Sequence, residues 1–190
     1  VLLSITFLYG NNQKIKHNVT QIKKTSEVQA MGFTNPSKTS KIDIEEAQAI
    51  IKSNIDVAEY LQESKGNFKF LVRHERRICM HQIEFDGRIS FEFEFLVDFN
   101  TRVAKLSGEH PISSQYKAMK LVIETQKIAQ RLQQGNRFYL LSIIAEASDK
   151  EQYTVMVEEY PNSDFKKPIK SEFYDVTLNP DKVEETDVPT

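Results

Sequence analysis

The feature that most constrains the fold is a long alternation of apolar and polar residues at positions 89–99. The odd positions carry large apolar side chains: Ile89, Phe91, Phe93, Phe95, Val97 and Phe99. The even positions carry Ser90, Glu92, Glu94, Asp98 and Asn100, with Leu96 as the exception. A period of two is typical of a strand with one face on a core and the other toward solvent. The pattern therefore predicts a sheet with one buried and one free face.

A hairpin is predicted just before this strand. The preceding residues alternate on odd numbers, and Asp86-Gly87 is a typical turn dipeptide. A two-residue loop would pair Phe85 with Arg88 and place the apolar faces of the two strands on opposite sides. A three-residue loop, 86–88, would pair Phe85 with Ile89 and align those faces. We therefore expect the three-residue loop.

Two helices are predicted from apolar residues at helical spacing. The first begins at Asp43, whose side chain forms a capping-box-like start with Glu46, and it ends at Gly66. The second covers residues 113–134. Each helix has one apolar face, so each is expected to pack on a sheet.

The remaining apolar segments predict further strands at 68–74, 137–147, 153–160 and 169–178. The first is followed by a slip in the alternation, which favours a bulge or tight bend. Residues 137–147 are apolar on both faces, as in a central strand. The resulting order is αββ, then αββ, then an extra strand. It predicts an α+β two-layer sandwich, with an antiparallel sheet and two helices on one face.

This order of elements, behind an apolar N-terminal segment, resembles the periplasmic domains of assembly-platform subunits in type IV pilus and type II secretion machines. The resemblance implies a permuted ferredoxin-like domain that acts as a dimerising scaffold in a single-pass membrane protein. The alternative fold is a cystatin-like or nuclear-transport-factor-like cone, as found in conjugation scaffold subunits.

The chain divides into four segments by composition. Residues 1–10 are uncharged and mostly apolar. Because a bilayer needs ~20 such residues, we expect them to be the end of a transmembrane anchor; the alternative is a buried strand. Residues 11–41 are expected to be a linker, 42–178 the α+β domain, and 179–190 a disordered acidic tail. The anchor predicts a periplasmic or extracytoplasmic domain, and its absence would predict a soluble cytoplasmic one.

Charge and motifs narrow the function classes. The net charge of −2 argues against a nucleic-acid binder, which usually carries a basic excess. The single cysteine excludes an intramolecular disulfide. The sequence contains no dinucleotide-binding, P-loop, serine-hydrolase or zinc-protease motif. We therefore expect a non-enzymatic protein without a cofactor.

Three small groups of residues could nevertheless carry chemistry. His74, Cys79 and His81 could ligate zinc, but structural zinc sites usually have four ligands and a second cysteine. Cys79 could act as a nucleophile with His81 or His110, although nothing in the sequence indicates an activated thiol. Glu92 and Glu94 could serve as paired acids and bases, although on an open sheet face they are more often solvated charges.

The expected function rests on surfaces. The candidate partner contacts are the basic residues Arg73, His74, Arg76 and Arg77 and the acidic residues Glu92 and Glu94, together with the sheet edge at 169–178. The apolar start, the linker and the small α+β domain, with the resemblance above, imply a scaffold or assembly subunit of a secretion, pilus or conjugation machine that acts through these contacts. Such a subunit would contact other protein subunits, including a second copy of itself. The alternatives are a soluble small-molecule-binding domain lined by phenylalanines 91, 93 and 95, and an enzyme without a recognisable motif.

Overall fold

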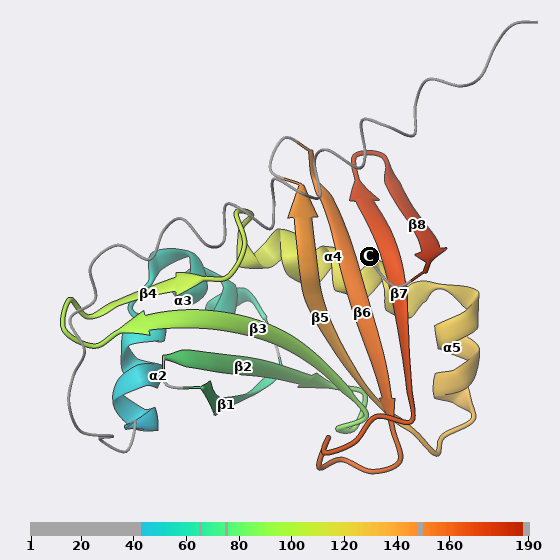
Figure 1. The fold of residues 1–190 in the computed structure, drawn as a ribbon, viewed down its shortest axis with the longest axis horizontal. Helices are drawn as coiled ribbons and strands as arrows, with labels where there is room; N and C mark the ends of the chain where they lie inside the picture. The colour runs from blue at the N-terminus through green and yellow to red at the C-terminus, as the bar shows by residue number, and fades with distance from the viewer. Residues whose placement is uncertain (1–42, 65, 75, 148–149, 188–190) are drawn as a thin grey trace, which may run out of the picture. The chain divides into compact units, whose positions relative to one another are not determined.

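An eight-stranded sheet organises the domain. A computed structural model describes residues 43–187 except 65, 75 and 148–149 (Figure 1). The expected anchor at 1–10 and linker at 11–41 lie outside the described residues. The helices are α2 (Ile44–Lys52), α3 (Ile55–Glu63), α4 (Ile112–Glu124) and α5 (Gln126–Gln133). The strands are β1 (Asn67–His74), β2 (Arg77–Glu84), β3 (Ile89–Asp98), β4 (Val103–Leu106), β5 (Phe138–Ala147), β6 (Gln152–Tyr160), β7 (Lys170–Leu178) and β8 (Asp181–Thr186).

The strand order is β1-β2-β3-β5-β6-β7-β8, and β4 pairs with the C-terminal part of β3. All neighbours are antiparallel except β3 and β5, which run parallel where Ile89–Glu92 lie beside Tyr139–Ser142. The α+β class and the central position of β5 are thus confirmed. The sheet is larger than expected, and the ferredoxin-like layout is not confirmed.

The chain repeats a larger unit than the predicted αββ. Two helices followed by four strands occur twice: α2-α3-β1-β2-β3-β4, then α4-α5-β5-β6-β7-β8. In the part of the chain that the structure describes, the two sets of strands pair only between β3 and β5, which run parallel. In Figure 1 the strands of the second set run steeply across the direction of β2 and β3, so the sheet turns sharply at this pair.

Each predicted long helix is two helices. Between α2 and α3, the side chain of Ser53 donates to the carbonyl of Ile50, and the side chain of Asn54 accepts from the backbone of Asp56. Between α4 and α5, the Thr125 hydroxyl donates to the carbonyl of Val122. Such short polar side chains compete with the helical hydrogen bonds and favour helix ends. The predicted cap at Asp43 is confirmed, because its carboxylate accepts from the backbone of Glu45 and Glu46.

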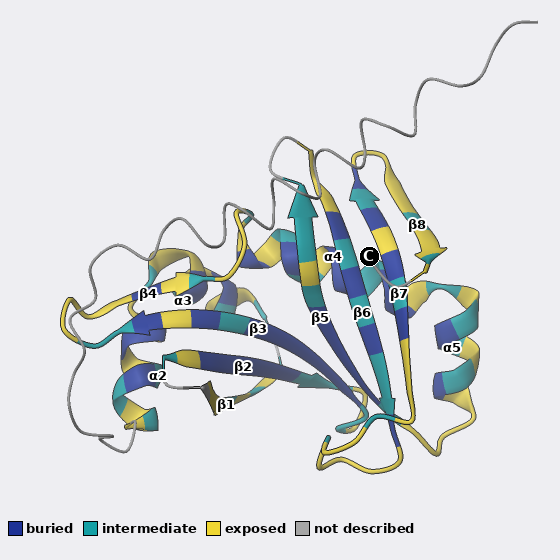
Figure 2. Cartoon of the chain, viewed as in Figure 1, coloured by how far each residue is buried: buried dark blue, intermediate teal, exposed yellow. Residues whose placement is uncertain are grey.

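The helices cover one face of the sheet, and the alternating side of β3 forms the core against them. Ile89, Phe91, Phe93, Phe95 and Val97 are all 0% exposed (Figure 2). In Figure 1, α4 passes behind β5 and β6, with which it packs. The predicted buried face is therefore confirmed. The opposite side of the sheet, which we call the open face, is not covered by any helix of the described residues (Figure 1).

The hairpin between β2 and β3 corrects the expected register. Glu84 pairs with Ile89, and the backbone N–H of Arg88 donates to the carbonyl of Phe85. The strands therefore have the register of a two-residue turn, Asp86-Gly87, which lies at the centre of the connection 85–88. Asp86 and Gly87 have positive φ, 56° and 84°, as the central residues of a type I′ turn require, and Phe85 before them also has positive φ, 51°. Because a shift of one residue exchanges the faces of a strand, the even positions of β2 face the core, and Cys79 and His81 face the other side.

The C-terminal residues also differ from expectation. Residues 181–186, assigned to a disordered tail, form β8 against β7. Val183 packs at the core, and Glu185 and Asp181 pair with Lys127 and Lys117 of the helices. These contacts are possible because the chain reverses at 179–180. The edge of β7, a candidate partner contact, is consequently occupied.

We expect Gly87→Ala to destabilise the domain by about 1 kcal/mol, because alanine is strained at positive φ. An added Cβ would meet no atom within 4 Å, so the loss would report backbone conformation rather than a clash. Urea denaturation would measure it. Asp86→Asn is the matched control, since asparagine tolerates this conformation. Equal stability of Gly87→Ala and the wild type would contradict the assigned turn.

Candidate functional site

A hollow on the open face brings together several residues that the sequence singled out. It has a volume of about 400 Å³ and lies between β1 and the loop that follows β6. Its floor consists of Cys79, His81, Ser90 and Glu92, and its walls include Leu71, Leu140, Tyr160 and Phe165. We call it the open-face hollow.

The register of the sheet positions the floor. On β2 and β3, His81 lies opposite Glu92 and Ile83 lies opposite Ser90. On the other side of β2, Lys69 lies opposite His81. The two-residue turn produces this arrangement, since the three-residue loop would have turned His81 toward the helices.

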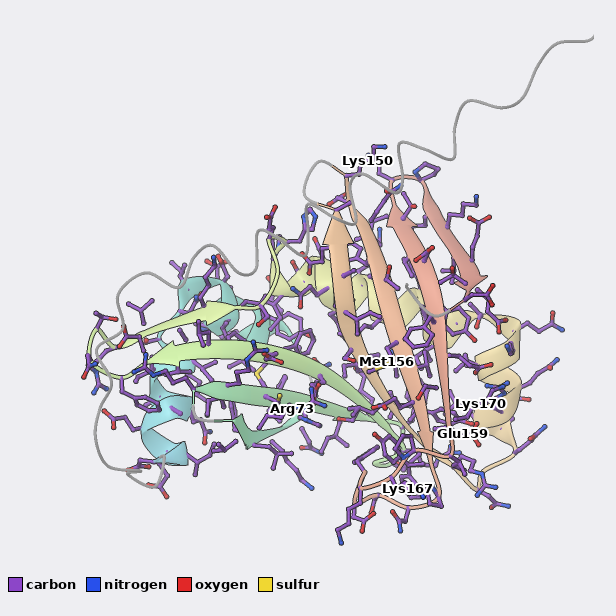
Figure 3. The ribbon with its side chains drawn as sticks, in the orientation of Figure 1. Arg73, Lys150, Met156, Glu159, Lys167 and Lys170 are labelled. Atoms are coloured by element: carbon purple, nitrogen blue, oxygen red, sulfur yellow. The ribbon has the colours of Figure 1, made fainter. Side chains whose placement is uncertain are left out.

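A hydrogen-bonded chain crosses the floor. The guanidinium of Arg73, which is labelled in Figure 3, donates to Glu92 Oε1 at 2.7 Å. His81 Nε2 lies 3.1 Å from Glu92 Oε2, and His81 Nδ1 lies 2.8 Å from Ser90 Oγ. His81, Ser90 and Glu92 are all buried. Three strands are therefore tied together by side chains as well as by backbone.

The charge of Glu92 fixes the direction of these bonds. Burial by itself raises the pKa of Glu92, but the hydrogen bond from His81 and the charge of Arg73 outweigh it, so the pKa lies below its ordinary value. Glu92 is thus ionised at neutral pH and accepts from His81 Nε2. In the neutral ring Nδ1 then accepts from the Ser90 hydroxyl.

The Ser90–His81–Glu92 chain has the contacts of a catalytic triad but not its accessibility. Ser90 is 1% exposed and lies inside β3, with β2 on one side and β5 on the other. A substrate carbonyl could reach its hydroxyl only if the side chains that cover it moved aside. The polar groups of the floor already bond to one another, so the hollow is better suited to recognition than to nucleophilic catalysis.

The cysteine and metal hypotheses receive no support from the geometry. Burial, followed by the nearby charge of Glu92, raises the pKa of Cys79 to about 12, so the thiol stays protonated. His110 lies elsewhere, with its ring against Tyr153 and its Nε2 3.2 Å from the carbonyl of Ala147. In residues 43–187, as far as they are described, no three His, Cys, Asp or Glu side chains converge as a metal site would require.

The remaining partner-contact candidates lie beside the hollow. Arg77 Nη1 lies 2.6 Å from Glu94 Oε1. Glu94 is two residues along β3 from Glu92, the partner of Arg73. His74 ends β1 opposite Arg77, and the carbonyl of Arg76 accepts from the backbone of Val97. Two of the predicted basic residues, Arg73 and Arg77, therefore pair with the two predicted acidic residues, Glu92 and Glu94.

Sequence reasoning missed Ser90 and the aromatic wall of the hollow. Ser90 was read as a solvated position of β3, and Tyr160 and Phe165 were not connected with β2. Their rings meet edge to face, with centroids 5.1 Å apart. The signal that could have found Ser90 was the two-residue reading of the Asp86-Gly87 turn, which places His81 with the polar side of β3.

Comparison with known proteins adds no name to this site. No protein-family model matches the chain, and no curated protein or solved structure matches it significantly. In the part of the chain that the structure describes, no helix has both the length and the apolar character needed to cross a bilayer. The site is therefore interpreted from its own geometry.

We expect Cys79 to resist thiol reagents in the native protein, because it is 1% exposed and its pKa is about 12. Iodoacetamide at neutral pH should label it only after unfolding in guanidinium. Mass spectrometry of the two samples would measure the difference. Rapid labelling of the folded protein would contradict the burial and raised pKa of this thiol.

We expect Glu92→Gln to lower the free energy of unfolding by about 2 kcal/mol at neutral pH, since it weakens hydrogen bonds to a buried charge. The folded pKa of Glu92 lies below its ordinary value of 4.5, so its stabilisation is present above that pH and is lost as the pH falls. The difference between variant and wild type should therefore shrink in acid.

The matched control for this change is Glu94→Gln. Its partner Arg77 is 62% exposed, so this pair should contribute less to stability. Urea titrations at neutral pH and at acid pH would compare the three proteins. Equal losses for both variants at neutral pH, or a gap that widens in acid, would refute the role given to Glu92.

Proposed function

We propose that this chain is a non-enzymatic scaffold or assembly subunit that binds a protein partner through the open face. One observation carries the proposal. Among the described residues, the outer edge of β1 has no partner strand, and β1 forms one wall of the open-face hollow. An unpaired strand edge offers backbone hydrogen bonds to an extended segment of another protein.

The two ends of the strand order, β1 and β8, differ in a way that supports this use of β1. β8 is six residues long and carries Asp181, Lys182, Glu184 and Glu185, charges that discourage edge pairing. β1 is eight residues long and exposes apolar side chains, with Leu71 at 52% and Val72 at 44%. Both residues line the hollow.

The charge of β1 indicates the chemistry of its partner. The strand contains Lys69 and Arg73 and no acidic residue. Two copies of β1 paired antiparallel about Leu71 would bring Lys69 of each copy toward Arg73 of the other, which like charges oppose. We therefore expect an extended segment of a different protein, with acidic residues beside an apolar one.

The proposal extends to the setting of the domain. Residues 1–10 are taken as the end of a membrane anchor, and the domain as extracytoplasmic, as the resemblance to secretion and pilus subunits implies. Of the two layouts expected, the cone is favoured, because helices lie on one face of a sheet that turns sharply between β3 and β5 (Figure 1). These points stay predictions.

Site-specific photocrosslinking of the full-length chain in its native cells tests the proposal. A photoreactive residue in place of Leu71 should give discrete crosslinked products whose mass spectra show an extended segment of another protein. The matched control is the same residue at Ile55, which is 71% exposed on α3. We expect Leu71→Glu to reduce crosslinking from a second photoreactive position at Val72, because acidic partner residues would be repelled.

Three results would overturn the proposal. They are no crosslinks at Leu71, equal crosslinks at Leu71 and Ile55, or crosslinks only to the same chain.

A further inference from the structure

A second pocket lies on the helix side of β2, opposite the open-face hollow. It has a volume of about 700 Å³, within the range of small-molecule sites. It is lined by the end of α3, the start of α4, the end of β2 and the following turn. The residues used below are Tyr60, Glu63, Ser64, Gln82, Glu84 and Tyr116. We call it the helix-side pocket.

Polar residues occupy core-facing positions at this end of β2. Ile78 and Met80 are 0% exposed and apolar, but the next two positions on the same face are Gln82 and Glu84. Gln82 is 2% exposed. Buried polar groups in a core strand cost stability unless they are hydrogen-bonded, so their presence calls for an explanation beyond packing.

A hydrogen-bonded network holds these groups. Tyr60 donates to Gln82 Oε1, and Gln82 Nε2 donates to Glu84 Oε1 at 2.8 Å. Tyr116 donates to the same oxygen at 2.5 Å, and Lys120 Nζ lies 2.9 Å from Glu84 Oε2. Burial by itself raises the pKa of Glu84, but the hydrogen bonds from Lys120 and Tyr116 outweigh this effect, so the pKa lies below its ordinary value. The carboxylate is therefore ionised at neutral pH.

The surroundings suit an ammonium group. Lys120 Nζ already lies 5.0 Å from the ring centroid of Phe85 and 6.0 Å from that of Tyr116, distances typical of cation–π contacts. Among the described residues, the lining presents two carboxylates, Glu63 and Glu84, two tyrosines and Phe85, and it includes no lysine or arginine. The Ser64 hydroxyl also lines the pocket, and it is buried with no hydrogen-bond partner among the described residues.

We propose that the helix-side pocket binds a small alkylammonium ion. The carboxylate of Glu63 attracts its charge, and Glu84, whose charge is shared with Lys120, adds to this attraction. The tyrosine rings contact its alkyl groups, and the Ser64 hydroxyl bonds to a polar group on its body. An anionic ligand would meet both carboxylates, which opposes it. This inference is independent of the proposed partner on the open face, because the two sites lie on opposite sides of β2.

The test compares choline with 3,3-dimethyl-1-butanol, which has the same shape but no charge. Two-dimensional NMR of the full chain would follow titrations at millimolar concentration. We expect choline to shift resonances of Tyr60, Ser64 and Tyr116 in a saturable way, and the neutral analogue to bind at least ~10-fold more weakly, equivalent to about 1.4 kcal/mol. No saturable shift with choline, or equal binding of the two probes, would overturn the proposal.

Variants separate the pocket from general charge effects. Glu84→Gln should abolish choline binding, and Glu63→Gln should weaken it several-fold. Glu84→Gln also disturbs the network around Lys120. If Glu84→Gln does not fold, Glu63→Gln carries the test. Asp56→Asn is the control, since Asp56 is exposed at the opposite end of α3. Unchanged choline affinity in Glu63→Gln, or equal weakening in Asp56→Asn, would refute the site.

Discussion

The register of β2 against β3 is the constraint on which the rest of the structure depends. The Asp86-Gly87 turn places Ile78 and Met80 opposite Phe95 and Phe93, and this closes the core under the helices. The same register sends the intervening residues of β2 to the open face, where they meet the polar side of β3. A single turn thus decides both which side chains are buried against the helices and which polar groups form the floor of the hollow.

The parallel contact of β3 with β5 is the second constraint. Antiparallel hairpins build each set of four strands locally, but this contact joins residues about fifty positions apart and needs α4 and α5 as its crossover. It also places Leu140 of β5 beside Ser90, so the hollow draws its walls from both halves of the chain. Neither half would form the site alone.

The period-two pattern of β3 was sufficient to predict the core, because burial on one face appears in the sequence as an apolar residue at every second position. The pattern was not sufficient to predict the register. Loops of two and of three residues were both consistent with the alternation, and the three-residue loop, which aligned the apolar faces, was the wrong choice. The aligned reading treated Phe85 as a core residue, whereas it is 45% exposed in the turn. β8 escaped notice for a related reason: its charged side chains face helix lysines across the sheet edge, and such pairing leaves no apolar pattern.

The two polar clusters pose one physical question, since they occupy opposite faces of the same stretch of β2. His81 bonds to Ser90 and Glu92 on one side, and Gln82 bonds to Tyr60 and Glu84 on the other. Apolar side chains of similar size would pack in both places without the desolvation of a carboxylate, and such replacements are often neutral or stabilising. Stability alone therefore does not account for either cluster. Each borders a solvent-accessible hollow, which is where a buried polar network can act on something outside the chain.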